Sequence, residues 1–111
     1  MKKKTTAEIK FNIELDVNNV PEKISWKASD GDDTQTEAKA VIMSIWDGKN
    51  KTSLNIDLWT KEMMAEEMKF FTFQILDTLA DTYKRSVGDD KVAKEIKDFA
   101  INIGKKSNVL K

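Results

Sequence analysis

The sequence predicts an α+β fold in which a four-stranded antiparallel sheet, made of two N-terminal hairpins, is followed by two amphipathic helices packed on one face of the sheet. Two observations support this prediction. Over most of residues 8–59, apolar and polar residues alternate with a period of two, as in half-buried strands. From residue 60 onward, apolar residues recur every three or four positions, as along one side of a helix. Strands followed by helices in this order are typical of α+β domains.

The first hairpin is predicted over residues 8–28. Residues 8–15 alternate without a fault, and the apolar face of this strand is Ile9, Phe11, Ile13 and Leu15. Turn-forming residues follow at 16–21, where the two asparagines tolerate a positive φ and the proline cannot donate to a ladder. The second strand then has its own apolar face, formed by Ile24, Trp26 and Ala28.

The second hairpin is predicted from strands at 36–47 and 52–59, joined by the short polar loop 48–51. If this loop places Asp47 opposite Thr52, every clearly apolar pair falls on one face, and a slip by one residue destroys that match. We therefore expect one face of this hairpin to belong to the core, through Val41, Met43, Ile45, Leu54, Ile56 and Leu58.

Two helices complete the fold. The first is expected to begin after an N-cap at Thr60 and to run for about 27 residues to Gly88. The second is expected to start at a cap formed by Asp89 or Asp90 and to end at Gly104. Residues 1–7 and 105–111 are expected to be a flexible basic N-terminus and a flexible tail, which leaves residues 8–104 as a single domain.

Composition excludes several function classes. The 111-residue chain contains neither cysteine nor histidine, so it has no thiol nucleophile, no Ser-His-Asp triad and no thiolate or imidazole metal ligand. The chemistry that remains would use carboxylates, lysines or Tyr83, and because the sequence shows no site for it, we expect no enzymatic activity, no cofactor and no metal. Because 19 basic residues balance 19 acidic ones, nucleic acid is not an expected partner. No apolar run is long enough for a signal peptide or a membrane span, so we expect a cytoplasmic protein without membrane insertion.

Five segments of the chain resemble the GldC-type gliding-motility accessory proteins of Bacteroidetes. They are residues 19–26, 39–47, 54–63, 81–83 and 97–100, and the most specific are Ser-Ile-Trp-Asp at 44–47 and Asp-Leu-Trp-Thr-Lys at 57–61. One departure is Met64, where the family pattern has proline at the start of a helix. The resemblance implies a cytoplasmic accessory protein of the gliding and associated secretion machinery, with no known enzymatic activity.

The second face of the second hairpin is the candidate binding site. It is not plainly polar, and the residues that we expect to contact a partner are Ala40, Ile42, Trp46, Asp57 and Trp59. Tryptophans dominate the energetics of many protein interfaces. The partner would be a component of the gliding machinery, and self-association, with a dimer as its simplest form, is a further expectation. The competing interpretation is that the N-terminal strands cover this face and make it core.

Four other features have simpler interpretations. A stripe at Met63, Met64, Met68, Phe70, Phe71 and Phe73 is either core or an adaptable client-binding surface. The second possibility, together with the SecB-like order of strands and helices, makes a holdase chaperone the alternative function. The acidic loop 29–35 lacks the spacing of a calcium loop, Lys2–Lys4 is too short for a membrane anchor, and Asp47 and Asp57 have no partner base.

Overall fold

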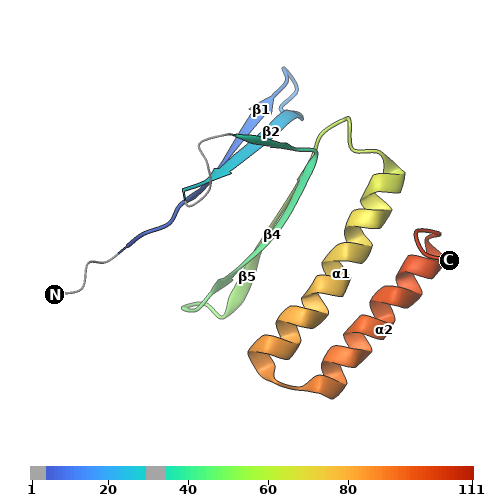
Figure 1. The fold of residues 1–111 in the computed structure, drawn as a ribbon. Coiled ribbons are helices and arrows are strands. Elements are labelled where there is room, and N and C mark those ends of the chain that lie inside the picture. Colours follow the sequence, from blue (N-terminus) through green and yellow to red (C-terminus); the bar gives the residue numbers. More distant parts are fainter. Residues whose placement is uncertain (1–4, 30–34) are drawn as a thin grey trace. The chain divides into compact units, whose positions relative to one another are not determined.

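The computed structural model describes residues 5–29 and 35–111. Five strands precede two helices, and every strand pair is antiparallel, which confirms the α+β prediction (Figure 1). The chain divides into two compact units, Met1–Met63 and Met64–Lys111, and each is described by itself. The prediction that the helices pack on one face of a sheet stays a prediction.

The first hairpin consists of β1 (Ile9–Leu15) and β2 (Pro21–Ala28). The two strands form the expected hairpin, and its register places Phe11 opposite Trp26 and Ile13 opposite Ile24. The turn is held by Asp16, whose Oδ1 accepts hydrogen bonds from the N–H groups of Asn18 (2.8 Å) and Val20 (3.0 Å). Asn19 in this turn has a positive φ of 62°, which asparagine tolerates better than most residues.

The prediction of one four-stranded sheet is wrong, because the expected strand at 36–47 is divided at Lys39. Its first part, β3 (Thr36–Ala38), joins β1 and β2 in a three-stranded sheet. Its second part, β4 (Ala40–Asp47), pairs only with β5 (Thr52–Trp59) in a two-stranded ribbon, within the described part of the chain. The apolar pattern is similar on both sides of Lys39, so the sequence does not reveal the bend.

Thr60 explains where the chain bends. The carbonyl oxygen of Lys39 accepts two hydrogen bonds from this residue, one from its N–H (2.8 Å) and one from its hydroxyl (3.2 Å). Thr60 is buried, as are Ile24 and Ser25 of β2. The small core of the first unit therefore lies where the two sheets meet, and no buried side-chain polar atom in the described residues lacks a hydrogen-bond partner.

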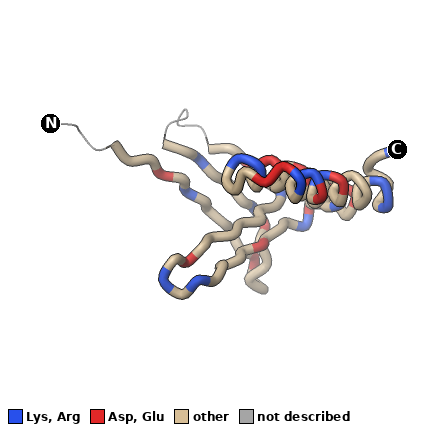
Figure 2. Tube along the Cα trace, turned by 90° about the horizontal axis from the view of Figure 1, so that it is seen from below, with Lys and Arg blue, Asp and Glu red and all other residues tan. Residues whose placement is uncertain are grey.

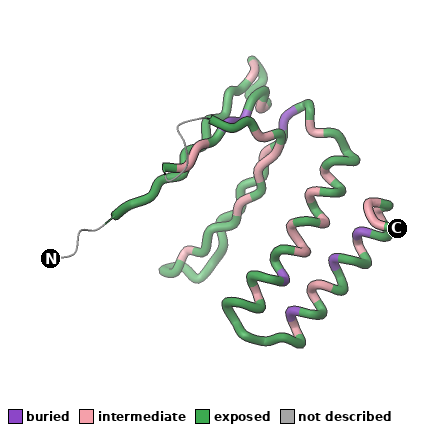
Figure 3. The backbone as a smooth tube through the Cα atoms, in the orientation of Figure 1, coloured by how far each residue is buried: buried purple, intermediate pink, exposed green. Residues whose placement is uncertain are grey.

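The register of the β4–β5 ribbon is the one that the sequence predicts. Asp47 lies opposite Thr52, and the pairs Ile45–Leu54, Met43–Ile56 and Val41–Leu58 share one face. The burial expected for these six residues is not observed, since all are at least partly exposed (Figure 3). Two strands make a single layer, and among the described residues of the first unit no second layer covers it.

The second unit is a helical hairpin of α1 (Ala65–Val87) and α2 (Asp90–Lys106). The predicted N-cap at Thr60 is wrong, because Thr60 is engaged with Lys39 and the helix begins only after Met64. Gly88 ends α1 with a left-handed φ of 80°, as expected. Asp89, rather than Asp90, caps α2 and accepts hydrogen bonds from two backbone N–H groups. The helix extends past Gly104 to Lys106.

Small residues line the contact between the two helices. Those that are buried are Ala80, Ala93, Ala100 and Gly104. A Cβ atom added to Gly104 would lie 2.7 Å from Leu110 Cδ1 and 2.9 Å from Phe73 Cδ1, so the glycine permits a close approach. The tail folds back over this point, because the N–H groups of Val109 and Leu110 both bond the Gly104 carbonyl.

Candidate protein-binding face

The five predicted contact residues lie on one face of the β4–β5 ribbon. Residues directly opposite each other in an antiparallel pair share a face, and here Ala40 is opposite Trp59 and Ile42 is opposite Asp57. Trp46, opposite Ser53, has the same parity along β4 and belongs to the same face. We call this surface the Trp face: Ala40, Ile42, Ser44, Trp46, Ser53, Asn55, Asp57 and Trp59.

The large apolar residues of the Trp face are accessible. Relative exposures are 66% for Trp46, 53% for Trp59 and 46% for Ile42. The two tryptophans are not neighbours, however. Trp46 lies near the loop and Trp59 at the other end of the ribbon, six positions apart along the ladder, or roughly 20 Å at ~3.4 Å per residue. The face therefore offers two separate aromatic anchors.

A polar pair occupies the middle of the Trp face. Ser44 Oγ lies 2.6 Å from Asn55 Oδ1, and the two residues are directly opposite each other. Ile42 separates this pair from Trp59, and its own cross-strand partner is the exposed Asp57. Two anchors flanking a polar centre fit a protein surface better than a single apolar plug, because interfaces combine aromatic hot spots with satisfied polar groups.

The loop that carries Trp46 is fixed by its neighbour Asp47. The Asp47 carboxylate accepts hydrogen bonds from the Lys49 N–H (3.0 Å), the Asn50 N–H (3.4 Å) and Asn50 Nδ2 (2.9 Å). The backbone donors of Lys49 and Asn50 lower the pKa of this carboxyl below its ordinary value, because they stabilise the charged form. These hydrogen bonds tie the Asp47 carboxylate to the following loop, and they are stronger while the carboxylate is ionised.

The carboxylates of the ribbon do not form a catalytic pair. Asp47 has the parity of the face opposite the Trp face, whereas Asp57 is on the Trp face. They are also five positions apart along the ladder, or roughly 17 Å. Within the described ranges, no group of three or more acidic side chains is placed to hold a metal ion. The candidate calcium loop falls mostly on residues 30–34, and Lys2–Lys4 on residues 1–4, which lie outside the described residues.

The Met/Phe stripe is divided by the structure. Phe73 lies against Gly104 in the contact between the helices, and its ring meets that of Phe70 edge to face at 6.4 Å. Met64 and Phe70 are exposed, whereas Met63, Met68 and Phe71 are intermediate. The stripe is therefore neither wholly core nor a continuous exposed surface.

Sequence reasoning missed a cluster of charges between the helices. Lys97 of α2 lies between two carboxylates of α1, with its Nζ 3.0 Å from Asp77 and 3.2 Å from Asp81. The hydrogen bonds that Lys97 donates to these two carboxylates raise its pKa above the ordinary value. The spacing of charged residues along either helix does not predict this contact, because the contact depends on how the two helices pack against each other.

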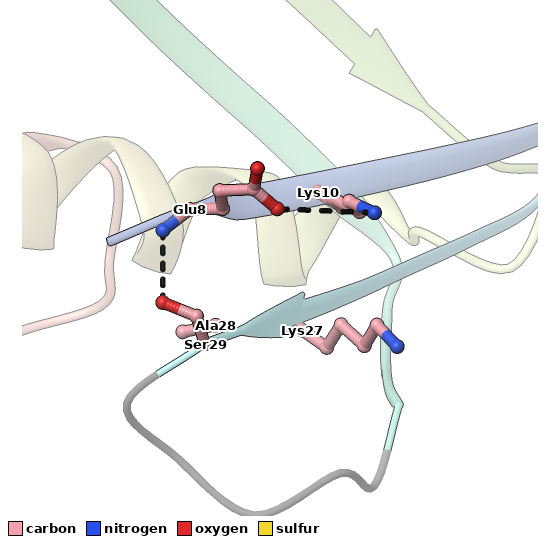
Figure 4. Close-up of a pocket in the computed structure, with 5 residues that line it drawn as sticks. All are labelled: Glu8, Lys10, Lys27, Ala28 and Ser29. Carbon is pink, nitrogen blue, oxygen red and sulfur yellow. Dashed lines mark hydrogen bonds and ion pairs between the residues drawn. The ribbon is translucent and has the colours of Figure 1, made fainter. Parts of the chain in front are cut away.

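A polar hollow of about 210 Å³ lies at the open end of the β1–β2 hairpin (Figure 4). There the Glu8 N–H donates to Ser29 Oγ at 2.8 Å, and the Glu8 carboxylate is 3.8 Å from Lys10 Nζ. Lys10 is directly opposite Lys27 in the ladder. The Glu8 and Lys10 side chains are largely exposed, and these contacts close the end of the hairpin.

Comparison with known proteins supplies the family. The profile described as "Gliding motility-associated protein GldC-like" matches residues 21–109, which is most of the chain. The chain belongs to the GldC-like family. The matched region includes β2 to α2, and therefore the whole Trp face. The search of curated proteins and the search of solved structures each found no match.

In the described part of the chain, neither helix has the length and apolar character needed to cross a membrane. The two helices instead carry both signs of charge interspersed along their length (Figure 2). A nucleic-acid-binding surface is typically a stripe of one sign, so this arrangement differs from one.

Proposed function

We propose that this GldC-like protein is a non-catalytic adaptor of the gliding-motility machinery and its associated secretion apparatus, and that it acts in the cytoplasm by binding a protein component through the Trp face. The exposure of Trp46 and Trp59 on one face of a register-defined ribbon carries the proposal. Tryptophan is among the residues most enriched at interface hot spots, and both of these tryptophans are at least half exposed.

The chemistry available on the chain also favours binding over catalysis. Acid–base work requires titratable groups whose environments separate their pKa values, and a site in which they converge. On the ribbon the two carboxylates are on opposite faces, and Asp47 is already engaged by its own loop. We therefore infer that the ribbon presents side chains to a partner.

Substitution of the two anchors tests the proposal. We expect a Trp46→Glu/Trp59→Glu variant to bind the partner much more weakly. Each tryptophan that contributes ~2 kcal/mol to binding accounts for a loss of about 30-fold in affinity. Val87→Glu is the control for an added negative charge, because it places one glutamate on an exposed apolar residue at the end of α1, outside the Trp face. A folded double variant that binds as tightly as Val87→Glu would remove the Trp face from consideration.

A holdase chaperone of the SecB type is the second candidate function. It is favoured by the exposed Met64 and Phe70 of the Met/Phe stripe, since flexible and aromatic side chains adapt to many clients. A holdase would suppress the aggregation of unrelated unfolded proteins, and a Met64→Glu/Phe70→Glu variant would suppress it less. Failure of the wild-type chain to delay such aggregation at a molar excess would sink this alternative.

A further inference from the structure

One edge of β4 has no partner strand among the described residues. In the two-stranded ribbon, β4 pairs with β5 along its other edge only. Backbone groups alternate between the two edges of a strand, and the Lys39 carbonyl points toward β5 because it bonds the Thr60 N–H. The N–H and C=O groups that point away from β5 are therefore those of Ala40, Ile42, Ser44 and Trp46.

This edge lacks the features that protect exposed strands. Natural edges are blunted by lysine, proline, bulges or short length. β1, an edge of the other sheet, carries Lys10 and Glu14 and has an irregular register beside Glu14. Between Ala40 and Trp46, by contrast, β4 contains no charged residue, no proline and no glycine, and its pairing with β5 is unbroken.

We propose that β4 pairs in antiparallel orientation with β4 of a second copy of this chain, about a two-fold axis at Met43, to give a four-stranded sheet ordered β5–β4–β4–β5. The pairing goes beyond the proposed adaptor function and does not depend on it. It uses backbone groups of the edge and leaves the side chains of the Trp face available to a partner. It also turns a two-stranded ribbon, which is marginal alone, into a sheet of four strands.

The residues of β4 complement themselves in this register. The axis places Met43 opposite Met43 and Val41 opposite Ile45 of the second copy. On the Trp face it places the small Ala40 opposite the large Trp46 of the second copy. The two-fold axis produces this pair twice, so a large side chain lies opposite a small one at both positions. The residues whose backbone points outward pair with one another, as hydrogen-bonded pairs require, which yields eight backbone hydrogen bonds by the antiparallel pattern of about two per pair.

Charge selects this register over its neighbour. With the axis at Met43, Lys39 lies opposite Asp47 of the second copy, and these opposite charges attract twice. Moving the axis by one residue to Ser44 places Lys39 opposite Lys49 instead. Using the free edge of β5 with an axis at Ile56 would place Lys51 opposite Lys61. Lys39, Lys49, Lys51 and Lys61 lie just outside β4 and β5, so in both alternatives like charges meet at the ends of the paired strands and disfavour the pairing.

A single introduced cysteine tests the register directly, because the chain has none of its own. At the axis, Met43 and its symmetry mate form a non-hydrogen-bonded pair with Cα atoms ~4.5 Å apart, which is within reach of a disulfide. We expect Met43→Cys to give a disulfide-linked dimer under mild oxidation. Ile45→Cys is the matched control on the same face, because the register separates its two copies by four positions, or ~13 Å.

Mass measurements by light scattering complete the test. The wild-type chain should have twice the monomer mass, and Ser44→Pro, which removes an outward N–H and spares the ladder with β5, should fall to monomer mass. Ser44→Ala keeps that N–H and should remain dimeric. If Met43→Cys does not fold, Val41→Cys/Ile45→Cys links the same register across the axis. A monomeric wild-type chain, or equal cross-linking of Met43→Cys and Ile45→Cys, would overturn the proposal whether or not the Trp face binds a partner.

Discussion

Single residues decide where this chain bends and where its helices can meet. Thr60 is the clearest case, because its side chain and N–H both bond the Lys39 carbonyl. A threonine before an amphipathic helix is also a good N-cap, and from the sequence alone Thr60 is predicted to have that role. Whether Thr60 caps a helix or bonds the Lys39 carbonyl depends on which backbone groups lie near it in the folded chain. The spacing of apolar residues in the sequence carries no information about that.

Replacing Thr60 with valine separates the two roles. Valine has nearly the same shape but no hydroxyl, so we expect the free energy of unfolding to fall by about 1 kcal/mol, the usual contribution of one hydrogen bond. Because α1 begins after Met64, helix content measured by circular dichroism should be unchanged under native conditions. A loss of helix content in the folded Thr60→Val variant would restore the N-cap interpretation.

Gly104 is expected to resist enlargement. Alanine has the higher helix propensity, by ~1 kcal/mol, but its Cβ would lie within 3.0 Å of Phe73 and Leu110. Overpacking typically costs about 1–3 kcal/mol, so we expect net destabilisation in urea unfolding. Leu110→Ala in the same chain should recover part of the loss, since the end of that side chain makes the closest contact. A Gly104→Ala variant more stable than the wild-type chain would contradict this account of the helix contact.

At the scale of elements, pattern and chemistry predicted most of what the structure shows. The β4–β5 register follows from matching apolar pairs, and the end of α1 at Gly88 follows from the preference of glycine for a left-handed φ. The residues of the Trp face follow from the same parity argument. The division of the sheet did not, because both parts of segment 36–47 have strand character and the bend depends on a distant residue.

The cap of α2 gives a test at this scale, because Asp89 and Asp90 are adjacent and chemically identical. Asp89 Oδ1 accepts hydrogen bonds from the N–H groups of Lys91 and Val92, both at 3.1 Å. We expect Asp89→Ala to lower the free energy of unfolding by ~1 kcal/mol, a typical cost for losing an N-cap. Asp90→Ala, in the first turn, should lose only a weaker interaction with the helix dipole. Equal effects of the two substitutions would contradict the assignment of the cap.

At the scale of the whole molecule, the pKa shifts of the two units predict losses of stability at opposite ends of the pH range. In the first unit, backbone N–H donors lower the pKa of Asp16 and of Asp47 below 3.8. Their stabilising effect is therefore present above pH ~3.8 and is lost as pH falls through the folded-state values. In the second unit, carboxylate partners raise the pKa of Lys94 and Lys97 above 10.5, so their effect is present below that pH and is lost as pH rises.

Two spectroscopic signals follow this difference. All three tryptophans are in the first unit, so tryptophan fluorescence should report its loosening in acid. Circular dichroism should report the helices of the second unit, which should weaken first in alkali. Asp47→Asn should reduce the acid sensitivity of the fluorescence and leave the alkaline change in circular dichroism intact. If acid perturbs both signals equally in the wild-type chain and in Asp47→Asn, the role assigned to this carboxylate is wrong.

The central claim is that this GldC-like chain acts by binding one protein component of its machinery. The most direct test is co-purification of the tagged chain from its native host, with mass spectrometry of the proteins that accompany it. We predict a short list dominated by one envelope-machinery component, present with wild-type chain and Val87→Glu and absent with Trp46→Glu/Trp59→Glu. A broad list of unrelated, partly folded proteins, unchanged by the tryptophan substitutions, would contradict the adaptor function and favour a holdase.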